Sequence, residues 1–190
     1  MTPWSPRLHQ AVDLACRAHM GQSRKDPDHA IPYPSHTFGV AYVLASYDFP
    51  EDVVIAGLLH DVVEDQPAFE PHLDAFGARV VTLVHAVSEI KLGPGGERIP
   101  WRTRRDRYVE ALREADPEAK AVACADKIHN MESIVLALDR GADMWASLRS
   151  TPEEQVHRLE DLRGAFAQGW SHPMLADFDR LLAELSARLP

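Results

Sequence analysis

The chain has 190 residues, of which 45% are apolar, and a formal net charge of −9 at pH 7, so we expect one domain with one active site across residues 1–190. The acidic balance argues against a nucleic-acid polymer as partner, because such binding depends on many lysine and arginine contacts to phosphates. Residues 1–7 lack the apolar core of a signal peptide, no run of about 18 apolar residues could span a membrane, and only two cysteines occur, so we expect a cytoplasmic protein.

Helical periodicity runs through the chain, and no segment shows the period-two alternation of a half-buried strand. The sequence therefore predicts an all-α fold, a single helical bundle. The first predicted helix ends before Gly21, and Ser35 is the predicted N-cap of the second. The predicted helices cover residues 5–20, 35–47, 51–65, 67–76, 78–90, 101–115, 118–139, 152–167 and 173–189.

The third predicted helix changes abruptly from seven apolar residues, 53–59, to the polar sequence HDVVED at 60–65. On a continuous helix with about 100° per residue, its four polar side chains fall within an arc of about 140°. Three carboxylates and an imidazole at the end of a buried segment carry a large desolvation cost unless a cation compensates them. The pattern indicates a divalent metal site, and a solvated helix end is the alternative interpretation of this segment alone.

Two further segments place polar side chains where a helix meets the core. Asp126 follows the small apolar run 121–125, and Asn130 lies one turn later on the same helix face. His36 stands at the predicted start of a helix, after a loop with three prolines. Taken singly, each of these residues is typical of a helix cap or a structural histidine.

In combination, these segments resemble a known family. The spacing of ligands in HD-domain metal phosphohydrolases is similar to that of His36, His60, Asp61 and Asp126. With segments 18–25, 32–36 and 125–130, the chain most resembles the hydrolase domain of RelA/SpoT-type alarmone enzymes, especially their small stand-alone Mesh-type relatives. The resemblance covers about residues 8–138, which leaves 139–190 as extra carboxyl-terminal helices of the HD-domain bundle.

The resemblance implies a site and its chemistry. It implies one divalent metal ion, usually manganese, held by His36, His60, Asp61 and Asp126. It makes Glu64 and Asp65 the catalytic pair that positions and deprotonates the attacking water. It implies substrate contacts from Arg24, Lys25, Arg104 and Asn130. The mixed nitrogen and oxygen ligands by themselves suit Mn, Fe or Zn better than Ca.

The resemblance also implies a small anionic nucleotide as substrate, and the leading hypothesis is release of pyrophosphate from the ribose 3′ position of guanosine tetra- or pentaphosphate. An HD-type nucleotidase that acts on another nucleotide or phosphomonoester is the alternative. A two-metal cyclic-dinucleotide phosphodiesterase would need additional histidines, for which His72 and His85 are available. A non-catalytic nucleotide-sensing module would be expected to lack Glu64 or Asp65, and both are present. By default, His129 is expected to be a structural or surface histidine.

Overall fold

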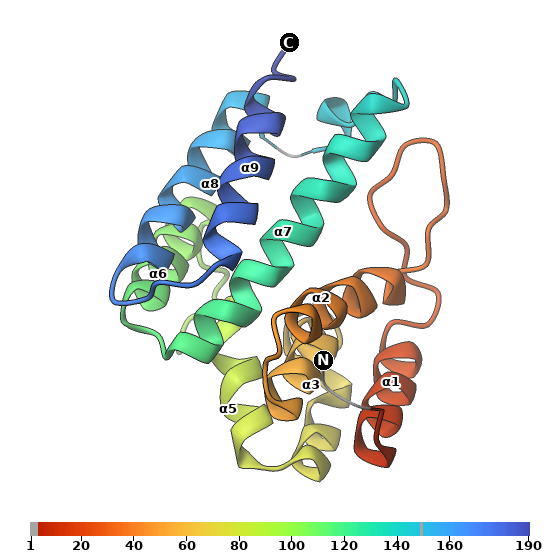
Figure 1. Cartoon of the computed structure of the whole chain (residues 1–190). Coiled ribbons are helices and arrows are strands. Elements are labelled where there is room, and N and C mark those ends of the chain that lie inside the picture. The colour runs from red at the N-terminus through yellow and green to blue at the C-terminus, as the bar shows by residue number, and fades with distance from the viewer. Residues whose placement is uncertain (1–3, 149) are drawn as a thin grey trace.

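The computed structural model describes residues 4–148 and 150–190, so Met1, Thr2 and Pro3 of the amino-terminal segment lie outside the described part. Helices dominate it (Figure 1). Among the described residues, β-type pairing is limited to two isolated bridges, Ser23 with Pro32 and Leu92 with Arg98. The predicted all-α fold is confirmed.

The helices follow one another along the chain, with long connections at residues 19–33 and 88–100. The longer ones are α1 (Pro6–Ala18), α2 (Pro34–Ser46), α3 (Glu51–Leu59), α5 (Ala78–Val87), α6 (Trp101–Glu114), α7 (Pro117–Asp139), α8 (Pro152–Ala167) and α9 (Met174–Ser186). The short ones are α4 (Val62–Asp65) and the 3-10 helices η1 (Pro67–Phe76) and η2 (Trp145–Ser147).

Helix α7 is the central element of the bundle. It runs between α1, α2 and α3 on one side and α8 and α9 on the other (Figure 1). Its residues 119–126 are all buried and rich in alanine, as at Ala121, Ala123 and Ala125. Small side chains let neighbouring helices approach closely, because the distance between helix axes depends on the side chains at the contact. The middle of α7 is therefore in the interior, within reach of α2 and α3.

The predicted continuous helix over residues 51–65 is wrong in its middle. Helix α3 ends at Leu59, and α4 begins at Val62 after a turn formed by His60 and Asp61. The His60 ring supplies the reason, because its Nδ1 donates to the Gly57 carbonyl at 2.8 Å and satisfies one of the acceptors that a helix end leaves open. The regular helical spacing assumed for the four polar side chains therefore does not hold across this turn.

Two other local predictions also need correction. Ser35 is not an N-cap: α2 begins at Pro34, whose fixed φ suits the first helical position, and Tyr33 precedes it without a side-chain cap. The segment Pro67–Phe76 is a 3-10 helix rather than an α-helix, and it contains Pro71, which has no N–H to donate. Helix α8 has the predicted bounds and a capping box between Thr151 and Glu154.

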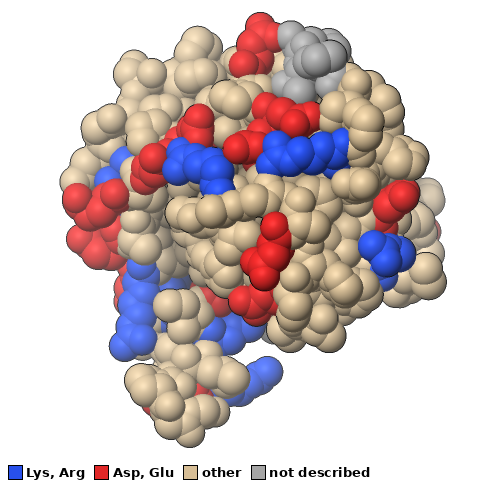
Figure 2. Space-filling model, turned by 90° about the horizontal axis from the view of Figure 1, so that it is seen from below, with Lys and Arg blue, Asp and Glu red and all other residues tan. Residues whose placement is uncertain are grey.

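Charge and apolar surface are distributed as the composition suggests. On the face in Figure 2, basic side chains form separate groups interspersed with acidic ones. Cys16 and Cys124 are both free thiols. None of the helices in the described part of the chain combines the length and apolarity needed to cross a membrane.

Candidate metal centre and catalytic cavity

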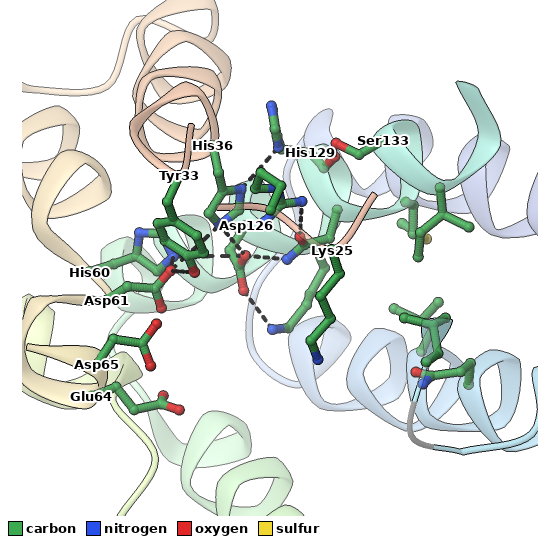
Figure 3. A pocket seen from close by; sticks show the side chains of 18 of the residues that line it. Lys25, Tyr33, His36, His60, Asp61, Glu64, Asp65, Asp126, His129 and Ser133 are labelled. Carbon is green, nitrogen blue, oxygen red and sulfur yellow. Dashed lines mark hydrogen bonds and ion pairs between the residues drawn. The ribbon is translucent and has the colours of Figure 1, made fainter. Parts of the chain in front are cut away.

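Side chains from three separate places in the sequence meet beside α7 (Figure 3). His36 comes from the first turn of α2, His60 from the turn after α3, and Asp126 from the middle of α7. One ligand atom from each of the three lies within 4.8 Å of the others, and all three residues are buried. Asp126 Oδ1 is 3.1 Å from His36 Nε2 and 3.8 Å from His60 Nε2. We call His36, His60 and Asp126 the His–His–Asp group.

Asp61, the fourth predicted ligand, lies directly beside the His–His–Asp group. Its Oδ2 is 3.0 Å from His60 Nε2 and 3.6 Å from His36 Nε2. The same oxygen accepts a hydrogen bond of 2.5 Å from the Tyr33 hydroxyl, which holds the carboxylate in place. The structure thus brings all four predicted ligands to one place, with Asp61 at the edge of the group.

The orientation of the His60 ring fits a metal ion. Because Nδ1 donates to Gly57, the neutral ring has its lone pair on Nε2. That Nε2 atom is buried and has no hydrogen-bond partner among the described residues, although it lies next to two carboxylates. A backbone carbonyl that fixes the other ring nitrogen is the usual support for a metal-binding histidine. The residues present therefore fit a divalent cation bound between them.

The electrostatics of the group also favour positive charge. Burial lowers the pKa of His36. Burial alone would lower the pKa of His60 as well, but the carboxylates of Asp61 and Asp126 outweigh it and raise that pKa to about 9. Burial opposes ionisation of Asp126, yet Lys127 and the two histidines hold the pKa of that carboxyl well below its ordinary value. The site holds ionised carboxylates at a place where positive charge is stabilised.

His129 supports the group from behind, a role that the sequence prediction missed. Its Nδ1 lies 2.9 Å from Nδ1 of His36. Room for its ring comes from Gly39, since a Cβ at that position would lie 2.0 Å from the imidazole Cδ2 of His129. A signal was present in the sequence: a glycine stands one turn after His36, and His129 stands one turn after Asp126.

Glu64 and Asp65 extend from α4 toward the same space as the His–His–Asp group (Figure 3). Glu64 Oε2 accepts a hydrogen bond of 3.2 Å from the Glu89 N–H, and Lys91 Nζ lies 3.2 Å from Glu64 Oε1. Lys91 Nζ is also 3.5 Å from Asp65 Oδ1. Burial raises the pKa of Glu64, and the charge of Lys91 opposes this rise. The partly buried Glu64 carboxylate is therefore a stronger base than a fully solvated one.

All of these side chains line one cavity of about 750 Å³. The same cavity is lined by the four predicted substrate contacts, Arg24, Lys25, Arg104 and Asn130. Asn130 Nδ2 donates to Asp126 Oδ1 at 2.5 Å, and its amide oxygen accepts from Arg24 at 2.7 Å. Arg104 donates to Glu89 at 2.5 Å, so its guanidinium is held by a carboxylate at the cavity wall.

The rest of the wall comes from residues that the sequence prediction left unassigned. Helices α8 and α9 contribute Arg158, Leu159, Leu162 and Leu185, so the extra carboxyl-terminal helices complete the cavity. His72 and His85 do not line it, and His85 Nε2 instead lies 3.4 Å from Glu70. The structure therefore offers no support for a second metal ion bound by these two histidines.

Comparison with known proteins now places the chain in a family. The family model described as HD domain matches residues 11–164. The chain belongs to the HD-domain family. This HD-domain protein is 37% identical over 131 residues to guanosine-3′,5′-bis(diphosphate) 3′-pyrophosphohydrolase MESH1 of Homo sapiens. The matched region covers 67% of this chain and 69% of that protein. It is 32% identical over 135 residues to the bifunctional (p)ppGpp synthase/hydrolase SpoT of Escherichia coli K12, covering 67% of this chain and 18% of that longer protein.

The fold of the HD-domain protein has a solved counterpart. A structure described as a metazoan ortholog of SpoT that hydrolyzes ppGpp superimposes with a TM-score of 0.76 at 24% sequence identity, over 97% of this chain and 98% of that chain. At this identity the likeness concerns the fold. Because it covers nearly the whole chain, it includes α8 and α9, for which the sequence prediction had no counterpart.

Proposed function

We propose that this HD-domain protein is a metal-dependent phosphohydrolase that removes the 3′-diphosphate from guanosine-3′,5′-bis(diphosphate) and releases GDP and pyrophosphate. The observation that carries the proposal is the shared cavity, in which the buried His–His–Asp group faces Glu64 and Asp65 and basic side chains complete the wall. Relatives such as MESH1, which is named for this reaction, support the choice of substrate.

The proposed metal ligands are the His–His–Asp group together with Asp61. The unpartnered Nε2 of His60 and the ionised Asp126 supply the donors that a divalent ion needs. Manganese is the proposed ion, since two imidazoles and two carboxylates suit it better than calcium. These four residues would hold the ion, which would supply Lewis-acid chemistry there: polarisation of a phosphoryl oxygen and a lower pKa for bound water.

Glu64 is the proposed general base. Water attacks the phosphorus bonded to the ribose 3′ oxygen, and the P–O3′ bond breaks with its electron pair on O3′. O3′ takes up one proton from solvent to become the ribose hydroxyl, and the proton that Glu64 removes from the water returns to solvent. The attacking water must lose one proton, and Glu64 is placed to accept it, since burial raises the pKa of its carboxylate and so makes it a stronger base. The Glu89 N–H and Lys91 hold the Glu64 carboxylate in place, and Gln22 donates to Asp65 at 2.9 Å.

The basic side chains of the cavity have the role of binding the nucleotide. Arg24 and Lys25 belong to the loop between α1 and α2, which lies beside α7 because Arg24 bonds to Asn130. A planar guanidinium can stack on a purine and an ammonium can neutralise phosphate. Local positive charge of this kind is needed to attract a polyanion to a chain with a net charge of −9.

One experiment tests metal and reaction together. Elemental analysis of the purified full chain should find about one divalent ion per chain, and the loaded protein should release pyrophosphate from guanosine-3′,5′-bis(diphosphate). His60→Ala and Asp126→Ala should each lose both the ion and the activity. Full activity in excess chelator would refute the metal-dependent reaction. Other nucleotides are tested in the same assay. Release of phosphate from one of them, without pyrophosphate release from guanosine-3′,5′-bis(diphosphate), would show that the protein is a nucleotidase for that nucleotide.

A further inference from the structure

Two arginines share one tryptophan ring at the part of the cavity formed by α6 and α8. Trp101 and Arg105 stand one turn apart on α6, and the Arg105 guanidinium carbon lies 5.3 Å from the indole centroid. Arg158 reaches the same ring from α8, at 5.0 Å. All three residues line the cavity that contains the His–His–Asp group. We call Trp101, Arg105 and Arg158 the arginine–tryptophan cluster.

The positive charge of the arginine–tryptophan cluster is incompletely neutralised. Arg105 Nε is buried and makes no hydrogen bond among the described residues. Its ion-pair partner, Glu89 Oε1, lies 3.6 Å away. Glu89 is already held by Arg104 at 2.5 Å. Burial lowers the pKa of Arg158 to about 10, and repulsion by Arg105 contributes to the fall. Two partly buried guanidiniums on the same ring are costly unless an anion joins them.

The carboxylate that could neutralise Arg158 is occupied elsewhere. Glu154 accepts from the Thr151 N–H in the capping box of α8 and lies 3.8 Å from Arg102. The hydrogen bond found for the Arg158 guanidinium goes to the neutral side chain of Gln155, at 3.2 Å. Planar guanidiniums suit phosphate oxygens, because their N–H groups can bind two oxygens at once.

The same cavity thus has acidic and basic parts of its wall. Asp61, Glu64, Asp65 and Asp126 lie at the proposed metal site, whereas α6 and α8 contribute the arginine–tryptophan cluster, which contacts Glu89. A cavity of about 750 Å³ is of the size that holds a small-molecule ligand. The substrate named for the relatives carries one diphosphate at each of two ribose positions. Only one of the two diphosphates can be at the reacting position.

We infer that Arg105 and Arg158, stacked on Trp101, bind the non-reacting 5′-diphosphate of the substrate. This inference rests on the proposed function, because it assumes that the 3′-diphosphate occupies the His–His–Asp end. Neither arginine contacts the reacting atoms; they bind and orient the nucleotide. The chemical class recognised is a nucleoside 5′-diphosphate, and a nucleoside without phosphates lacks the group that the two guanidiniums contact.

The test measures binding without hydrolysis. Calorimetry with the full chain should show that GDP, which retains the 5′-diphosphate and has no 3′-diphosphate, binds more tightly than guanosine. Arg158→Met and Arg105→Met should each weaken GDP by about tenfold and leave guanosine unchanged, as expected for the loss of one charged contact. Arg102→Met is the matched control, since it removes the same charge from α6 at a side chain that is 84% exposed, and it should bind both ligands as the wild type does.

The outcomes separate this inference from the proposed function. If the wild type binds GDP and guanosine equally, or if the arginine variants weaken both ligands alike, the inference is overturned even when pyrophosphate release is observed. If GDP binding responds as expected but no pyrophosphate is released from guanosine-3′,5′-bis(diphosphate), the proposed function fails and the diphosphate site stands. Melting temperatures show whether each variant is folded. If Arg158→Met does not fold, Arg158→Lys takes its place. This variant keeps the charge but not the planar fork, and it should lose part of the preference for GDP.

Discussion

The imidazole of His129 meets that of His36 through their Nδ1 atoms, which lie 2.9 Å apart, while Nε2 of His36 faces Asp126. Burial lowers the pKa of His129 to about 4, so its ring is neutral and can accept a proton shared with His36. This arrangement fixes which nitrogen of His36 carries the hydrogen, and leaves Nε2 with a lone pair toward the centre of the group.

We therefore expect His129→Phe to weaken metal binding about 10- to 100-fold, as is typical when a hydrogen-bond partner of a ligand is lost. Phenylalanine keeps the ring that packs against Gly39 but has no nitrogen for His36. Calorimetric titration of the metal-free protein with Mn²⁺ measures the effect. His157→Phe, a change at a side chain that is 74% exposed, is the control. Unchanged Mn²⁺ affinity in His129→Phe would mean that His129 only fills space.

Glu64→Gln should separate metal binding from proton transfer. The amide keeps the size of the side chain but cannot accept the proton of the attacking water, so turnover should fall by about 10² to 10⁴. Metal content should stay at the wild-type value, because Glu64 is not among the proposed ligands. Single-turnover release of pyrophosphate gives the rate, and elemental analysis gives the metal. Near-normal turnover in Glu64→Gln would mean that another group is the general base.

Lys91→Met should shift the pH dependence of turnover. Burial raises the pKa of Glu64, and the positive charge of Lys91 counteracts the rise, so removing that charge raises the pKa further. Since a general base acts in its deprotonated form, the acid limb of the profile should move to higher pH. The variant should lose more activity at pH 6 than at pH 8. Lys91→Arg keeps the charge and should have the same acid limb as the wild type. If Lys91→Met also has the wild-type acid limb, Glu64 is not the group that titrates in the profile.

Arg24→Ala should raise KM by about tenfold while kcat changes less. The Arg24 guanidinium bonds to Asn130 at the cavity wall and has no proposed part in proton transfer, so its contacts should exist in both the bound substrate and the transition state. Loss of one charged hydrogen bond is worth about that factor. Steady-state kinetics on guanosine-3′,5′-bis(diphosphate) measure both constants. Arg17→Ala, an exposed position on α1, should leave them unchanged. An unaltered KM would place Arg24 outside the binding site.

The sequence by itself determined the all-α class and the approximate places of the helices. The reason is local: the apolar spacing, proline starts and glycine stops act within a few residues of one another. The apolar runs before His60, Asp61 and Asp126 also marked these polar residues, because polar groups inside a fold must be compensated. His36 joined the proposed ligands only through the family resemblance, since it follows a loop and no apolar run.

Tertiary structure alone decided how those groups meet. The break between α3 and α4 depends on the His60 side chain reaching Gly57, a contact that helix periodicity does not encode. His129 gained its role because α2 and α7 cross at Gly39, and the arginine–tryptophan cluster exists because α8 packs against α6. Contacts between residues far apart in the chain arise from packing of whole helices, so the orientation of each ring and the depth of the cavity follow from the fold rather than from spacing along the sequence.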